Sequence, residues 1–103
     1  MSAREDKSMV EDDARRLIRA INELQAKDRV GELVSIDNAV TYHTGIGPDF
    51  YPESPRCEAA VEYLIEQDAL VREEGYDPLN LSVEGVAYGW FSITQTGLDM
   101  ARS

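Results

Sequence analysis

The sequence is poor in the residues that cross-link small proteins. Cys57 is the one cysteine among 103 residues, and His43 is the one histidine. A lone cysteine can form neither an intramolecular disulfide nor a thiolate zinc cage by itself. The chain must therefore be held together by a hydrophobic core. Its length and its 43% of apolar residues suit one modest core in a single domain.

Long hydrophobic runs are also missing. The longest uninterrupted apolar stretches, such as residues 86–88, are only a few residues long, whereas a helix that spans a bilayer needs roughly 20. The polar N-terminus, residues 1–7, is followed by no apolar region of the kind found in secretory signals. We therefore expect a cytoplasmic protein with no membrane segment.

Basic residues are scarce and unevenly placed. The chain carries 10 Lys and Arg against 20 Asp and Glu, for a formal net charge of -10, and only two of the basic residues are lysines. Residues 1–52 hold ten acids and seven bases, while residues 53–103 hold ten acids and three bases. This charge opposes docking of the C-terminal half on a polyanion. The composition would also suit a halophilic host, where molar salt shortens the screening length to about 3 Å.

Two stretches have the hydrophobic spacing of amphipathic helices. In residues 9–27 a single stripe is formed by Val10, Ala14, Leu17, Ile18, Ile21 and Leu24. Ser8 and Glu11 fit a capping box at the start of this helix. The second helix is predicted from Pro55, directly after Ser54, to near Gln67, with an apolar stripe of Cys57, Ala60, Val61, Leu64 and Ile65.

Shorter elements are predicted from turn residues and branched or aromatic runs. They are, in order, a strand at 32–36, a brief helix capped by Asp37 and ending near His43, a loop at 45–54, strands at 69–73 and 86–94 around a hairpin loop at 75–85, and a final helix from Thr94 or Gln95 through Ala101. The sequence thus predicts one α+β domain over residues 9–103, preceded by a tail of residues 1–8.

Four motifs occur along the chain in a characteristic order. They are Val34-Ser35-Ile36-Asp37-Asn38-Ala39, Thr44-Gly45-Ile46, the stretch from Glu62 to Val71, and Trp90 to Leu98 with its Thr94-x-x-Gly97 entry into the last helix. This order resembles the winged helix-turn-helix family over about residues 10–102. The resemblance implies a three-helix core, a β-hairpin wing and a short C-terminal helix.

The same resemblance implies a non-enzymatic transcriptional regulator that binds double-stranded DNA. The second helix of the turn would enter the major groove, and the wing would contact the backbone. On this interpretation the candidate DNA-contacting residues are Arg56 and Gln67, at the two ends of that helix, and Arg72 just before the wing. Many isolated winged-helix proteins are dimers, so a homodimer through the first and last helices is also implied.

The helix expected in the groove has an acidic outward face. Glu58, Glu62 and Glu66 recur at i, i+4 and i+8, opposite the apolar stripe. Groove-reading helices generally use Arg, Lys, Asn or Gln. Five arginines could still supply a local positive surface for DNA: Arg15, Arg16, Arg19, Arg29 and Arg56. The alternative is an acidic protein-interaction module that does not bind DNA and whose Glu58, Glu62 and Glu66 face a basic partner or another subunit.

No pattern of catalytic, cofactor-binding or metal-ligating residues is recognised. His43 has acids nearby in the sequence but no ligand spacing, and Cys57, on an apolar helix face, is expected to be a small buried hydrophobe. The aromatic residues of the loop and the wing strands are expected to complete the core rather than to stack on bases: Phe50, Tyr51, Tyr88 and Trp90. We therefore expect no enzyme and no cofactor.

Overall fold

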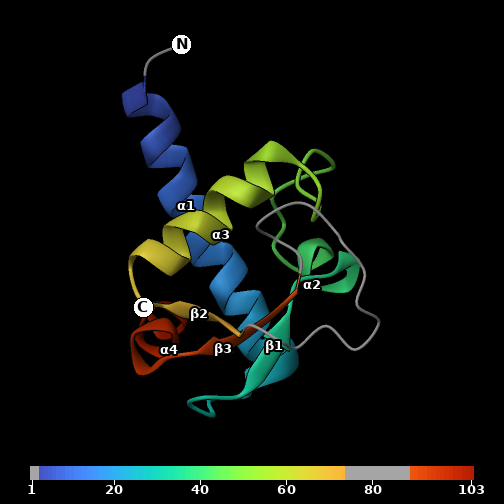
Figure 1. Ribbon diagram of the computed structural model, residues 1–103. Helices are drawn as coiled ribbons and strands as arrows, with labels where there is room; N and C mark the ends of the chain where they lie inside the picture. The colour runs from blue at the N-terminus through green and yellow to red at the C-terminus, as the bar shows by residue number, and fades with distance from the viewer. Residues whose placement is uncertain (1–2, 74–88) are drawn as a thin grey trace.

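The computed structural model describes residues 3–73 and 89–103, with side-chain placements from Lys7 onward. Figure 1 shows how the elements are arranged. In chain order they are α1 (Ala3–Ile21), a π-helical turn η1 (Asn22–Ala26), β1 (Leu33–Ser35), α2 (Asn38–Tyr42), α3 (Pro55–Glu66), β2 (Leu70–Glu73), β3 (Trp90–Ile93) and α4 (Gln95–Arg102). The predicted α+β class is confirmed. No helix in these residues is long and apolar enough to cross a membrane.

Three helices begin where the capping residues predict. Asp37 Oδ1 accepts the Val40 N–H at 3.0 Å at the start of α2, and Ser54 Oγ accepts the Cys57 N–H at 3.1 Å at the start of α3. At the start of α4, Thr94 Oγ1 accepts the Gly97 N–H at 3.0 Å. Each cap satisfies a backbone donor that the first turn of a helix leaves unpaired, so these boundaries are set locally.

The first helix differs from its prediction at both ends. It begins at Ala3, so Ser8 lies inside α1 and the predicted capping box is wrong. The residues before Ser8 are mostly good helix formers, which lets the helix extend. At the other end the regular helix stops at Ile21 and widens into η1. The wider turn moves Leu24 away from the apolar stripe, and its side chain is 36% exposed as a result. Ala26 is buried instead.

The sheet is antiparallel with strand order β1-β3-β2. Phe91 on the central strand pairs with Val34 of β1 and with Arg72 of β2. The strand predicted at 69–73 and the end of the strand predicted at 86–94 are confirmed; the predicted hairpin loop at 75–85 and residues 86–88 lie outside the described residues. The side chain of Gln25 in η1 is joined to the backbone of β1, donating to Ser35 O and accepting from Ser35 N, both at 2.7 Å.

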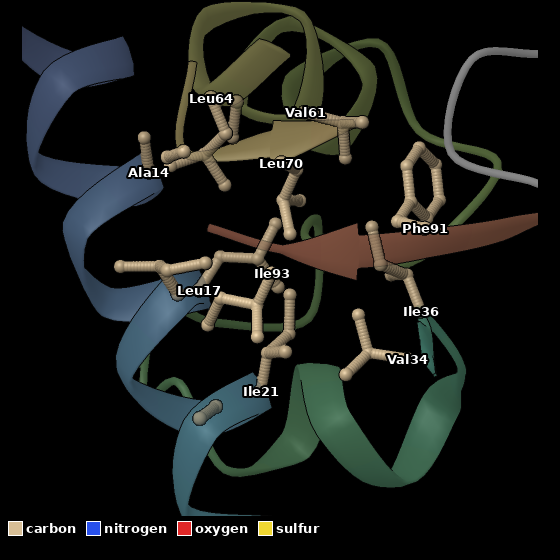
Figure 2. Close-up of a cluster of buried hydrophobic side chains, with 14 of the residues drawn as sticks. Ala14, Leu17, Ile21, Val34, Ile36, Val61, Leu64, Leu70, Phe91 and Ile93 are labelled. Atoms are coloured by element: carbon tan, nitrogen blue, oxygen red, sulfur yellow. The ribbon is translucent and has the colours of Figure 1, made fainter. Parts of the chain in front are cut away.

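The core lies where α1, α3 and the sheet meet. In Figure 1 α3 crosses α1, while the strands and α4 lie below the crossing. Figure 2 shows the core side chains converging from these elements, among them Leu17, Leu64 and Phe91. Cys57 and Phe50 are also buried, as predicted. The core thus holds α3 with one side inward and leaves its other side open to solvent.

Candidate interaction surface

The exposed side of α3 is acidic. The buried side of α3 is formed by Cys57, Ala60, Val61 and Leu64. Glu62 and Glu66 are exposed and Glu58 is half-buried, on the side that their spacing predicts. We call these three residues the acidic face of α3. Carboxylates so placed present negative charge to whatever binds there.

Arg56, the one basic residue of α3, points back toward the protein. Its Nε and Nη2 donate to the two carboxylate oxygens of Asp13 on α1, at 2.6 and 3.0 Å, and its Nη1 donates to Asp49 at 3.0 Å. Asp13 is 1% exposed and the Arg56 side chain 26% exposed. These hydrogen bonds, above all those to Asp13, raise the pKa of Arg56 further above its usual value. Arg56 therefore fastens the start of α3 to α1 and to the preceding loop.

The three residues predicted to contact DNA lie on two elements: Arg56 and Gln67 at the two ends of α3, and Arg72 on β2. Gln67 is the exposed residue that ends α3, roughly 16 Å along the helix axis from Arg56 at 1.5 Å per residue. Arg72 is half-buried on β2, with its guanidinium carbon 4.9 Å from the centre of the Phe91 ring. Their roles on DNA stay predictions. A phosphate at Arg56 would have to compete with two carboxylates already bound there.

Other arginines are also engaged with groups of this chain. Arg16 Nε binds Asp12 at 3.1 Å, Arg29 pairs with Glu32, and Arg19 donates to the backbone oxygen of Ser103 at 3.0 Å. A polar cleft of about 400 Å³ beside α1 brings Arg15, Arg16 and Arg19 together, but Asp12 and Glu23 line it too. Arg15, Arg16 and Arg19 therefore lie among acids rather than forming a surface of one sign.

A larger pocket lies between α2 and the loop that leads to α3. It has a volume of about 640 Å³, and its lining includes Asp37, Thr41, Tyr42, Phe50, Tyr51 and Glu53. Among the described residues that line it, none is Lys or Arg. Tyr42 is 83% exposed and Tyr51 46% exposed, so the prediction that the loop aromatics complete the core is right for Phe50 and wrong for Tyr51.

Sequence reasoning did not single out Tyr42, although a signal was present. Tyr42 lies two residues after Val40, which α2 buries. Two residues along a helix correspond to a rotation of about 200°, which places Tyr42 on the opposite side from the core. An aromatic residue on the outer side of a short helix, followed by a loop with a second tyrosine, is a recognisable combination.

The single histidine and the single cysteine of the chain lie in different surroundings. His43 is exposed at the end of α2, and Cys57 is buried. Burial raises the pKa of the Cys57 thiol to about 12. Across residues 3–73 and 89–103, no three or more His, Cys, Asp or Glu side chains are grouped so as to hold a metal ion.

Alkylation of Cys57 is expected to be about a thousandfold slower in the native protein than in the unfolded chain at pH 8, because the thiolate is the reactive form. The measurement is the rate of reaction with iodoacetamide, followed by mass spectrometry, with and without concentrated guanidinium chloride. Equal rates in the two conditions would mean that the thiol is accessible, contrary to its burial.

No protein-family model, no curated protein and no solved structure matches this chain. Function is therefore inferred from the surface of α3 and the pocket beside it.

Proposed function

We propose that the chain is a winged-helix domain that binds a basic protein partner through the acidic face of α3, and that this helix does not enter a DNA groove. Two features support the winged-helix part. The element order agrees with what the sequence resemblance implies, and β2 pairs antiparallel with β3, as the two strands of a hairpin wing would. The second feature is the Thr94-x-x-Gly97 motif, in which the Thr94 side chain caps the start of α4.

The observation that carries the proposal is the charge on the exposed side of α3. Its acidic face consists of Glu58, Glu62 and Glu66, and its one base, Arg56, is bound to Asp13 and Asp49. Proteins that bind duplex DNA gain most of their affinity by neutralising phosphates with Lys and Arg. Placed in a major groove, this face would bring carboxylates toward phosphates instead. A basic protein surface would be attracted to it and oriented by it.

The proposal is tested by neutralising the two exposed carboxylates with Glu62→Gln and Glu66→Gln. Glu58 is left unchanged because an acid in the first turn also stabilises the helix itself. We expect the double variant to bind the partner about tenfold more weakly, since exposed charges contribute up to about 1 kcal/mol each. The partner is first captured from native lysate, and its affinity is then measured for each variant at several salt concentrations.

The matched control is Glu23→Gln with Asp99→Asn. These residues are exposed on η1 and α4, and the change in net charge is the same. A partner that depends on the acidic face is lost with the α3 variant and kept with the control. Equal loss with both variants would mean that only net charge matters.

Binding to labelled random-sequence duplex DNA is measured with the same proteins. We expect no binding from low to molar salt. Affinity that falls linearly in log salt, and that improves when Glu62 and Glu66 are neutralised, would overturn the proposal in favour of a DNA-binding regulator.

A further inference from the structure

The geometry points to a second contact with the same partner: the pocket between α2 and the loop before α3 receives an arginine side chain. This inference rests on the proposed function, since it assigns a specific anchor to a basic protein partner. It concerns different residues, however, and it is tested separately.

The pocket has the size and the exposed aromatic rings of a recognition site. Its volume of about 640 Å³ lies within the range of about 300 to 1,000 Å³ found for ligand pockets. Tyr42 and Tyr51 contribute to its lining while remaining 83% and 46% exposed. Tyrosine is enriched at protein interfaces because it combines a large apolar ring with a polar end. Two such rings at one pocket are available to stack on an incoming side chain.

The charge of the pocket selects a cation. Asp37 and Glu53 are among the lining residues, and none of the lining residues in the described part of the chain is Lys or Arg. A phosphate or a carboxylate would meet repulsion there. Arginine suits this lining better than lysine, because its flat guanidinium stacks on tyrosine rings and donates two parallel hydrogen bonds to a carboxylate.

The wall formed by the loop is fixed by hydrogen bonds and packing. Phe50 is buried in the core, and Ser54 Oγ both accepts from Tyr51 N, at 3.2 Å, and donates to Tyr51 O, at 2.8 Å. Asp49 is bound to Arg56 at the start of α3. Little ordering remains to be done when a ligand enters, which favours binding.

The pocket and the acidic face of α3 are neighbours in the chain. Glu53 lines the pocket and precedes Pro55, the first residue of α3, by two positions. The acidic face begins at Glu58 in the first turn of α3, so we assign the acidic face and the pocket to one partner. The surface as a whole requires a partner with both a cationic patch and a protruding arginine.

The test is an NMR titration of the ¹⁵N-labelled protein with N-acetyl-arginine amide. We expect saturable shifts confined to the backbone amides of residues 37–42, 49–51 and 53, with a Kd of about 10 mM for this single side chain. N-acetyl-lysine amide should bind several-fold more weakly, and N-acetyl-glutamate amide should not bind. Tyr42→Ala and Glu53→Gln should each weaken the arginine probe about three- to fivefold. Tyr42 is too exposed for its loss to disturb the fold.

Glu23→Gln, the same chemical change at an exposed residue outside both the pocket and the acidic face of α3, is the matched control and should leave the affinity for the probe unchanged. Shifts that centre on α3, equal binding of the lysine and arginine probes, or insensitivity to Tyr42→Ala would each overturn the pocket assignment and leave the proposed function standing. Conversely, probe binding in the pocket together with duplex DNA binding through α3 would retain the pocket as an arginine site and overturn the proposed function.

Discussion

Arg56→Leu is expected to lower the free energy of unfolding by about 3 to 5 kcal/mol, the range found when one partner of a buried ion pair is removed. Asp13 is 1% exposed in the protein, and its carboxylate accepts two hydrogen bonds from Arg56. The variant removes both donors and leaves the carboxylate buried. Urea unfolding followed by circular dichroism measures the loss. A change below about 1 kcal/mol would mean that water or another group replaces the guanidinium at no large cost.

Two further variants separate the ion pair from the packing around it. Asp13→Leu combined with Arg56→Leu should recover most of the loss, because apolar residues often replace a buried pair without penalty. Asp13→Ala alone should cost less than Arg56→Leu, since Arg56 keeps Asp49 and is 26% exposed. Arg56 is thus a poor position at which to test DNA binding, because its loss affects stability first.

Gly97→Ala is expected to destabilise the protein by about 2 kcal/mol, although alanine is the better helix former. A Cβ on Gly97 would lie 2.3 Å from the backbone oxygen of Ala69 and 2.8 Å from Ile93 Cγ1. Overpacking of this kind costs about 3 kcal/mol, and the gain in helix propensity returns about 1. The oxygen cannot move freely because it also accepts from Thr94 N at 3.1 Å.

The measurement is the thermal midpoint together with the urea midpoint. Thr96→Ala, an exposed neighbour on the same helix, is the control and should change stability by less than about 0.5 kcal/mol. If Gly97→Ala left both midpoints at the wild-type value, α4 would not be held against Ala69 as closely as the structure places it.

The sequence was informative where neighbours along the chain decide the structure. Ser54 and Pro55 predict the start of α3, and the four-residue spacing of glutamates predicts its acidic face, because both depend on one helix alone. The π-helical turn after Ile21 was not predictable, since nothing in the local pattern distinguishes it from a continuing helix.

The partner of Arg56 could not be predicted for a different reason. Asp13 lies 43 residues away in the chain and meets Arg56 only after α3 has packed across α1. Arg56 is a candidate DNA contact by its position at the start of α3, and that position alone does not show which helix lies behind it. In the same way the pocket exists only because the loop folds back beside α2. The two tyrosines can be noticed in the sequence, but their meeting at one pocket depends on that fold.

The bond between Gln25 and Ser35 has a consequence for how the protein meets other chains. A strand at the edge of a sheet offers unpaired backbone groups on which a foreign strand can add, and such addition leads to aggregation. The amide of Gln25 supplies one donor and one acceptor to Ser35, as a neighbouring strand would. Intermolecular sheet extension at this end of β1 is thereby blocked.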